Sequence, residues 1–168
     1  MSTEQLRTRF QALVDENRRI VYKICSSYCP NRDDRDDLAQ EIVTELWKSF
    51  ATFDERSRFS TWLYRVALNV AISFSRRERR RARHVVSGGE NLLDVAESAR
   101  GTPEDLFVLY QFIEDLDPLN KALVLLYLDG YAYREISDVL GITETNVATK
   151  ISRLKSAIRT HFSSTAAT

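Results

Sequence analysis

The chain has 168 residues, enough for one average domain or for two small helical bundles with modest cores. Its 24 basic and 24 acidic residues cancel, so any attraction to nucleic acid must come from local clusters of charge. No apolar run is long enough to cross a bilayer and the N-terminus lacks a signal-peptide pattern, so we expect a soluble, cytoplasmic protein.

The first two predicted helices are amphipathic. Apolar residues recur at helical spacing from Phe10 to Tyr28, where Pro30 and Asn31 end the pattern. A second helix is predicted from about Asp34 to Phe50, with Leu38, Ile42, Leu46 and Phe50 on its inner face. Its outer face is an acidic stripe of Asp37, Glu41 and Glu45, which could meet a basic protein surface.

Cys25 and Cys29 are the chain's two cysteines, one helical turn apart in an apolar stripe. This pattern argues against a disulfide framework and predicts reduced thiols in the hydrophobic core. A metal site is the alternative, but only His84 and His161 could add nitrogen ligands, and neither has zinc-motif spacing. We therefore expect no metal and no cofactor.

Between Phe59 and Arg81 a predicted third helix runs from aromatic residues directly into a dense arginine cluster. Ser60 or Thr61 can cap this helix. Guanidinium groups bind phosphates and aromatic faces stack on exposed bases, so the segment predicts a surface for single-stranded nucleic acid. Each aromatic residue could instead pack in the hydrophobic core. For Trp62 this interpretation is the stronger one, since tryptophan at helical spacing usually fills a core.

Residues 85–103 carry paired glycines, small residues and scattered acids without periodicity, which predicts a flexible linker. It would separate an N-terminal domain, residues 1–84, from a C-terminal domain, residues 104–168. Helical spacing resumes from Pro103 to Leu116 and from Leu119 to Leu128, and no strand period is sustained. The predicted fold class is all-α, with two small helical bundles joined by the linker.

The segments Tyr133–Leu140 and Thr143–His161 meet at Gly141 in the pattern of a helix-turn-helix. Gly141 allows the tight turn, and Thr143 can cap the second helix. Apolar residues from Val147 to Ile158 would hold one face to the core. The opposite face offers duplex contacts through Thr145, Asn146, Thr149, Lys150, Ser152, Arg153 and Lys155. The alternative is an ordinary helical hairpin with a solvated basic face.

Three segments, DDLAQEIVTELWKSF, FSTWLYRVALNVAISFSRRERRR and YREISDVLGITETNVATKISRLKSAIR, closely resemble a bacterial sigma factor of the sigma-70 family, extracytoplasmic-function (ECF) group. The resemblance covers nearly the whole chain. It implies a promoter-melting domain (region 2) at 1–84, tied by a linker to a duplex-reading domain (region 4) at 104–168.

By this resemblance, the second helix docks on the clamp helices of the RNA polymerase β′ subunit. The residues implied are Asp37, Gln40, Glu41, Glu45, Leu46 and Trp47. The third helix would hold the −10 promoter element as a single strand through Phe59, Trp62, Tyr64, Arg65, Asn69, Arg76, Arg77 and Arg80. Region 4 would bind the −35 duplex and the β flap. A solvated acidic face is the alternative for the second helix.

The chain departs from the family pattern at four positions. Leu68 stands where arginine is common, Ser73 where an aspartate is usual, Ser137 where a small alanine is customary, and Ala148 where a basic residue is usual. We expect these changes to alter how the third helix captures a base that has left the stack in the −10 element, and to weaken one −35 contact. They do not remove the chain from the family.

The implied function is a sigma factor that binds core RNA polymerase and directs promoter-specific initiation through −35 and −10 elements. It is not expected to be an enzyme, because melting needs no catalytic residue. The resemblance also implies an anti-sigma protein, which could hold the chain at the inner membrane. The alternatives are a stand-alone helix-turn-helix regulator and a hydrolase using the Asp33 to Glu41 carboxylates with the cysteines and histidines.

Overall fold

The structure is a computed structural model that describes residues 1–81 and 102–166. Every regular element in these ranges is a helix, which confirms the all-α fold class. The helices are α1 (Thr3–Glu16), α2 (Arg18–Tyr28), α3 (Arg32–Phe50), α4 (Phe59–Arg81), α5 (Pro103–Glu114), α6 (Pro118–Leu128), α7 (Tyr133–Leu140) and α8 (Glu144–Ala166). None of these helices is long and apolar enough to span a membrane.

The predicted single helix from Phe10 to Tyr28 is wrong, because the chain breaks at Asn17 into α1 and α2. Asn17 leaves helical geometry with φ −108° and ψ 12°, and its side-chain amide donates to the Leu13 carbonyl at 2.8 Å. An asparagine side chain competes for backbone hydrogen bonds in this way, which explains why apolar periodicity alone missed the break.

Local side chains set where several helices begin. The Asn31 side chain accepts a hydrogen bond from the Asp34 amide at 2.8 Å and starts α3 two residues before the predicted position. Helix α4 begins at Phe59, where the Thr61 and Trp62 amides donate to the Arg58 carbonyl. The prediction that Ser60 or Thr61 caps this helix is therefore wrong, since both residues lie within its first turn.

The helix-turn-helix prediction is confirmed. Helix α7 ends at Gly141, whose φ of 67° is left-handed and favours glycine. The Thr143 hydroxyl then accepts a hydrogen bond from the Asn146 amide at 3.1 Å, which satisfies one free donor at the start of α8. Val147, Ile151 and Leu154 hold α8 to the core.

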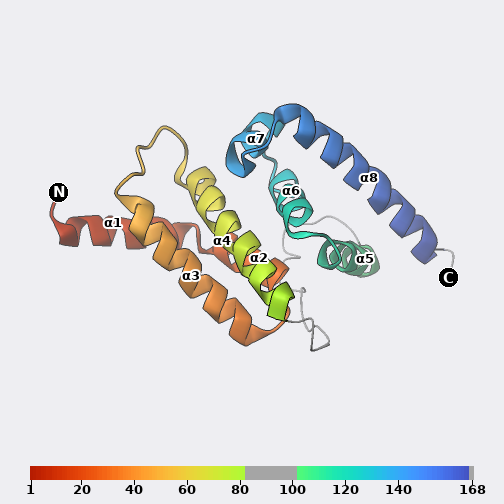
Figure 1. Cartoon of the computed structure of the whole chain (residues 1–168), viewed down its shortest axis with the longest axis horizontal. Helices are drawn as coiled ribbons and strands as arrows, with labels where there is room; N and C mark the ends of the chain where they lie inside the picture. Colours follow the sequence, from red (N-terminus) through yellow and green to blue (C-terminus); the bar gives the residue numbers. More distant parts are fainter. Residues whose placement is uncertain (82–101, 167–168) are drawn as a thin grey trace.

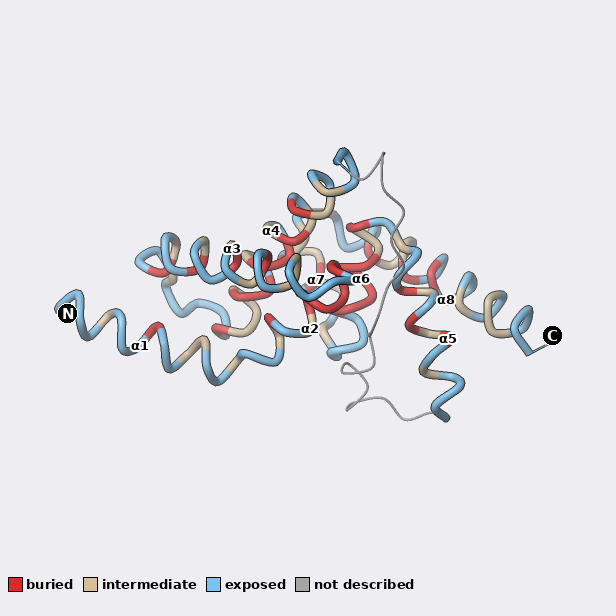
Figure 2. The backbone as a smooth tube through the Cα atoms, turned by 90° about the horizontal axis from the view of Figure 1, so that it is seen from below, coloured by how far each residue is buried: buried red, intermediate tan, exposed pale blue. Residues whose placement is uncertain are grey.

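The helices form two bundles, α1 to α4 and α5 to α8, that lie side by side (Figure 1). The bundles contact each other, because α4 packs against α6 and α7 while α2 packs against α5 and α6. One continuous core cluster contains buried residues of both bundles, and buried backbone gathers where α2, α4, α6 and α7 meet (Figure 2). Most of the predicted linker lies outside the described residues. Its last residue, Pro103, begins α5 behind an N-cap at Thr102.

Candidate functional site

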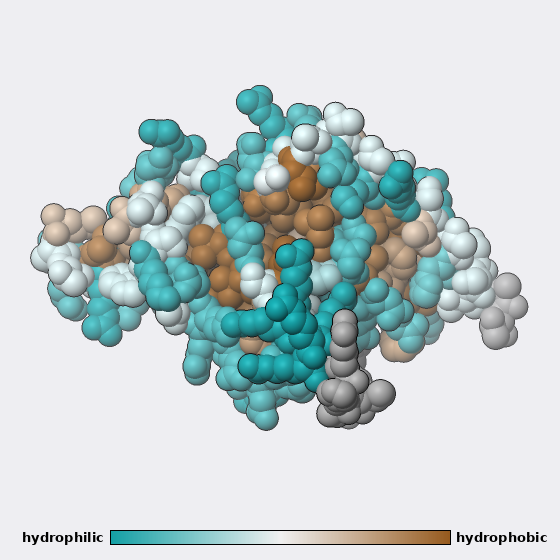
Figure 3. Space-filling model, viewed as in Figure 1, coloured by the Kyte–Doolittle hydropathy of each residue, from teal (hydrophilic) through white to brown (hydrophobic). Residues whose placement is uncertain are grey.

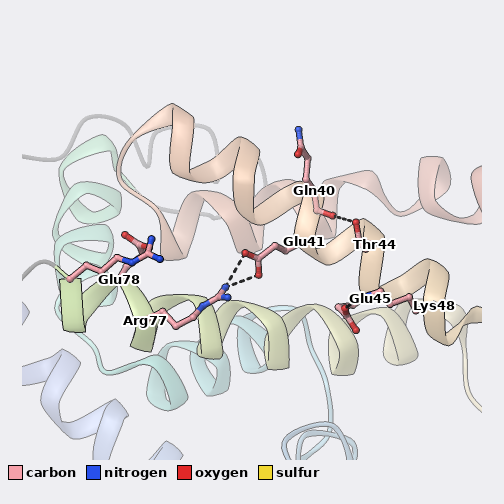
Figure 4. A network of polar contacts seen from close by, with 8 residues as sticks. Gln40, Glu41, Thr44, Glu45, Lys48, Arg77 and Glu78 are labelled. Carbon is pink, nitrogen blue, oxygen red and sulfur yellow. Dashed lines mark hydrogen bonds and ion pairs between the residues drawn. The ribbon is translucent and has the colours of Figure 1, made fainter.

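A polar groove of about 580 Å³ lies between α3 and α4. Asp37, Gln40, Glu41 and Glu45 of the predicted polymerase set line it, and Arg77 of the predicted −10 set faces them from α4. The Arg77 guanidinium donates to both carboxylate oxygens of Glu41, at 2.7 and 2.9 Å (Figure 4). The structure therefore brings predicted protein-binding and DNA-binding residues together in one groove.

Trp47 and Leu46 differ in what they can offer a partner. The Trp47 residue is 39% exposed, with its ring 5.1 Å from that of Phe10, so one part is packed and the other is open to a partner. Leu46 is fully buried in the core of the N-terminal bundle. It cannot contact polymerase directly, and its contribution to this surface is to anchor α3.

Four residues of the predicted −10 set form an exposed polar face on α4. Arg65, Asn69, Arg76 and Arg80 are all exposed, and their spacing of four, seven and four residues places them on one side of the helix. Arginine can hold phosphates and asparagine can read a base edge. This face therefore has the composition of a surface that follows a nucleic-acid strand.

The aromatic residues at the start of α4 pack into a cluster. Phe59 is buried, and its ring lies 5.6 Å from Phe53 and 5.4 Å from Trp62, while Trp62 also contacts Phe50 at 6.2 Å. The core interpretation of Trp62 agrees with these contacts. Because Trp62 keeps partial exposure, its outer edge remains accessible to a base.

Tyr64 is fully buried, although it belongs to the predicted −10 set. Its hydroxyl donates to the Asp129 carboxylate in the C-terminal bundle, and its ring meets that of Tyr131 edge-on at 5.3 Å. Burial and the Asp129 carboxylate raise the pKa of Tyr64, so the hydroxyl stays protonated and able to donate. In this structure the C-terminal bundle, rather than DNA, covers Tyr64.

The second helix of the helix-turn-helix exposes most of the predicted duplex contacts. Thr145, Asn146, Thr149, Ser152 and Arg153 are exposed on α8, and Lys150 is half-buried. The Lys155 ammonium lies 4.8 Å from the centre of the Tyr127 ring, and the hydrogen bond with Tyr127 raises the lysine pKa. Lys155 thus packs on α6, while the exposed residues form the free face of α8.

Two departures from the family pattern have structural explanations. Leu68 is fully buried, so it can replace an arginine only by joining the core rather than by contacting DNA. The Ser137 hydroxyl donates to the Ile142 carbonyl at 2.6 Å and thereby ties α7 to the turn that follows it. Ser73 is exposed and Ala148 is half-buried.

Cys25 and Cys29 are buried free thiols, in agreement with the core interpretation. Burial raises the pKa of each thiol to about 12. Among the described residues, no group of three potential ligands gathers to hold a metal ion.

Sequence reasoning missed two features. One is a second groove, of about 1270 Å³, between α1, α2 and α3, with Val21, Tyr22 and Val43 among its apolar lining. Its polar lining includes Arg18, Arg19, Arg32 and Arg35. The other is the cluster of Lys23, Tyr64 and Asp129, whose members are distant in sequence. Periodicity assigns faces to single helices, so it gave no signal for either feature.

Comparisons with known proteins agree with this geometry. Family models for sigma-70 region 2 and sigma-70 region 4 match residues 13–81 and 106–158. The ECF RNA polymerase sigma factor SigW of Bacillus subtilis (strain 168) is 30% identical over 162 residues, covering 89% of this chain and 87% of that protein. The ECF RNA polymerase sigma-E factor of Escherichia coli (strain K12) is 29% identical, covering 89% of this chain and 84% of that protein.

Solved structures show the same fold. The sigma factor RpoE in complex with the anti-sigma factor NepR, from Bartonella quintana, superposes with a TM-score of 0.68 over 96% of this chain and 98% of that chain, at 16% identity. CnrH in complex with the cytosolic domain of CnrY gives a TM-score of 0.67 over 94% of this chain and 90% of that chain, at 22% identity.

The fold and its exposed surfaces define a helical protein with a polar groove between α3 and α4 and a helix-turn-helix formed by α7 and α8. The matches to regions 2 and 4 and the similarity to SigW identify it more closely. The chain belongs to the sigma-70 family, in the extracytoplasmic-function group. It is an RNA polymerase sigma factor that directs promoter-specific initiation, and a stand-alone helix-turn-helix regulator is not favoured.

Proposed function

We propose that the chain binds core RNA polymerase through the groove between α3 and α4, reads the −10 element with α4 and reads the −35 duplex with α8. The observation that carries this proposal is the position of Glu41 beside Arg77 in one groove. Polymerase contact on α3 and strand contact on α4 would then occur on adjoining surfaces of a single bundle.

The chemistry of the groove supports a basic partner. Asp37, Glu41 and Glu45 supply carboxylates along α3, and Gln40 adds an amide, all at least partly exposed. Trp47 lies at the edge of the same helix and could serve as an aromatic anchor at the interface. Complementary charges of this kind raise the specificity and the rate of association more than they raise the affinity. The clamp helices of the β′ subunit are the partner that we propose.

Promoter opening requires binding energy rather than a catalytic group. The exposed arginines of α4 would hold phosphates of the displaced strand, while Asn69 and the outer edge of Trp62 contact bases. Stacking contributes about 1–3 kcal/mol per base, which offsets part of the cost of unstacking. Sigma factors act without catalytic chemistry of their own, and we propose the same here. The buried thiols, with pKa values raised to about 12, are poor nucleophiles and give no support to a hydrolase.

We also propose an anti-sigma partner, because one structural neighbour was solved in complex with an anti-sigma factor and another in complex with the cytosolic domain of a second protein. The groove between α1, α2 and α3 joins apolar residues to several arginines, which suits an acidic amphipathic helix. Tyr22→Glu and Val43→Glu would weaken binding of an isolated anti-sigma protein. Binding to core polymerase would remain unchanged in both variants.

The main test mixes the purified chain with bacterial core polymerase and analyses the mixture by gel filtration. A permanganate footprint on a supercoiled promoter library follows. We expect co-elution and reactive thymines upstream of a start site. Glu41→Ala should weaken both signals, whereas Glu16→Ala, an exposed acid outside the groove, should change neither.

Two other results of this test would contradict the proposed function or the proposed polymerase surface. If the folded chain fails to bind core polymerase but still binds duplex DNA alone, the proposal is wrong and a conventional helix-turn-helix regulator is the better explanation. If co-elution occurs but Glu41→Ala has no effect, then the groove is not the polymerase surface.

A further inference from the structure

The groove between α1, α2 and α3 combines apolar and basic lining. Tyr22 and Val43 are large apolar side chains that stay exposed, and both line this groove. Four arginines line it as well, against a single acidic residue. One of them is held at the start of α3, because the Arg35 guanidinium donates to the Cys29 and Pro30 carbonyls at 2.8 and 2.9 Å. The groove therefore suits an occupant with both apolar and acidic side chains.

A buried hydroxyl in the same groove favours an occupant with polar groups. Ser26 of α2 lines the groove and is 3% exposed, and among the described residues its hydroxyl has no hydrogen-bond partner. Buried polar groups are nearly always hydrogen-bonded. A peptide that enters the groove brings backbone amides and carbonyls that can bond to this hydroxyl. The Ser26 hydroxyl thus favours a polypeptide over a purely apolar ligand.

One segment of this chain, outside the described residues, has the composition that the groove requires. Residues 90–97 have the sequence ENLLDVAE, and residues 85–99 contain three acids but no lysine or arginine. Two helical turns would place the acids of this segment on one side and its apolar residues on the other. The acids are Glu90, Asp94 and Glu97, and the apolar residues of the opposite side are Leu92, Val95 and Ala96. The pattern is too short to appear as sustained periodicity across residues 85–103.

The described residues on either side of this segment lie close to the helices that form the groove. Arg81 ends α4 and lines the polar groove together with Asp34, so the end of α4 lies beside the start of α3 (Figure 1). Hydrophilic side chains cover this end of the bundle (Figure 3). Thr102 caps α5, which packs against α2. The 20 residues from 82 to 101 can span about 66 Å when extended, so residues 90–97 can reach the groove.

We propose that residues 90–97 bind in the groove between α1, α2 and α3, with their apolar side against Tyr22 and Val43 and their acids toward the arginines. Because segment and groove belong to one chain, the effective concentration is on the order of millimolar, so a weak interaction fills the groove. The free chain then occupies its own groove before any partner arrives. An anti-sigma helix that uses this groove has to displace residues 90–97, and this consequence alone rests on the proposed function.

The test measures whether the groove is already filled in the full chain. A fluorescent peptide with the sequence of residues 89–98 is titrated, up to about 1 mM, into the wild-type chain and into the double variant Leu92→Ser and Val95→Ser. A ligand's apparent affinity falls with the fraction of chains whose site is empty, so we expect the peptide to bind the double variant about tenfold more tightly. The matched control is Val85→Ser with Val86→Ser, which changes two apolar residues outside the segment and should leave the wild-type affinity unchanged.

Two further variants locate the binding site. Val43→Glu, added to the double variant, should remove the gain in peptide affinity, because it places a carboxylate in the apolar lining. Leu128→Glu is the matched control, since Leu128 is an exposed apolar residue of α6 outside the groove. Amide hydrogen exchange of residues 90–97 should be slowed in the wild-type chain, and Val43→Glu alone should remove this protection.

Several results would overturn the proposal. They are equal peptide affinity for the wild-type chain and the double variant, binding to neither, binding that Val43→Glu leaves unchanged, and unprotected amides in residues 90–97 of the wild-type chain. Each measurement uses the chain without polymerase, DNA or an anti-sigma protein, so failure here leaves the proposed function intact. A chain that protects residues 90–97 but never binds core polymerase would contradict the proposed function alone.

Discussion

Leu46 and Trp47 are neighbours in the sequence, but α3 turns their side chains in different directions. Leu46 is fully buried, whereas Trp47 is 39% exposed. Neighbouring positions of α3 thus hold one side chain that packs in the core and one that is open to a partner.

We expect Leu46→Ala to lower the free energy of unfolding by about 2–5 kcal/mol, because it leaves a cavity in a close-packed core. Trp47→Ala should lower the free energy of unfolding less. It should weaken binding to core polymerase by about tenfold, because an exposed aromatic side chain can act as an anchor at an interface. Urea unfolding and a binding titration measure the two effects. Equal loss of stability in both variants would show that Trp47 acts mainly through packing.

The buried thiols predict a dependence of stability on pH. Burial raises the pKa of Cys25 and Cys29 from 9.0 to about 12 in the folded chain. Above about pH 9, unfolded thiols lose their protons while folded ones keep them, so the unfolded state gains stability. The free energy of unfolding should thus fall as the pH rises from 9 toward 12.

Urea unfolding at several alkaline pH values checks this direction. The double variant Cys25→Ala and Cys29→Ala should show a smaller fall. The remaining fall should come from Tyr28 and Tyr64, whose pKa values burial also raises. If the free energy of unfolding falls with pH equally steeply in the double variant, the thiols are excluded as the source of this pH dependence.

For single residues, the sequence predicted the contacts that a side chain can make better than it predicted whether that side chain is exposed or buried. The spacing of Arg65, Asn69, Arg76 and Arg80 is a property of one helix, and the structure exposes all four. Tyr64 also lies on α4, but its burial depends on Asp129 and Tyr131, which are far away in the chain. A periodic pattern contains no information about such distant partners.

Among the elements, the turn between α7 and α8 depends on one backbone conformation. Gly141 has a φ of 67°, and a Cβ added there would meet no atom within 4 Å. The cost of a substitution therefore comes from the backbone alone, at about 1–2 kcal/mol for alanine. We expect Gly141→Ala to lower both stability and affinity for the −35 duplex, as measured by urea unfolding and duplex titration.

Gly141→Asn is the matched control for this turn. Asparagine tolerates the left-handed conformation better than alanine, so its effect should be smaller although its side chain is larger. If alanine and asparagine were equally harmful, a steric clash rather than backbone strain would be responsible.

Element boundaries were predicted well where the sequence has a strong local signal. Tyr133–Leu140 matches α7 because Gly141 and Thr143 both mark the turn. The break at Asn17 was missed because the apolar stripe continues across it from α1 into α2. The asparagine competes with the helix through its side chain, an effect that hydrophobic periodicity does not detect.

At the scale of the whole molecule, the shared core predicts that the two bundles unfold together. Calorimetry of the full chain should give a single peak whose calorimetric and van't Hoff enthalpies agree. Asp129→Asn should broaden or split this peak by weakening the contact between the bundles. Asp115→Asn should leave it single, and two peaks in the wild-type chain would show that the bundles are independent.

The sequence predicted two bundles and their order, but not their contact. Each bundle has its own periodic helices, and these are visible residue by residue. The packing of α4 on α6 and α7 instead depends on side chains from both bundles joining one core. The division at 1–84, 85–103 and 104–168 stays a prediction.

The aromatic cluster around Phe50 has a spectroscopic consequence. The chain has two tryptophans, and both lie at this cluster, Trp47 through Phe10 and Trp62 through Phe50, Phe53 and Phe59. The C-terminal bundle contains tyrosines but no tryptophan. Tryptophan emission, excited at wavelengths where tyrosine does not absorb, therefore reports only on the N-terminal bundle, giving this sigma factor an intrinsic fluorophore confined to one half.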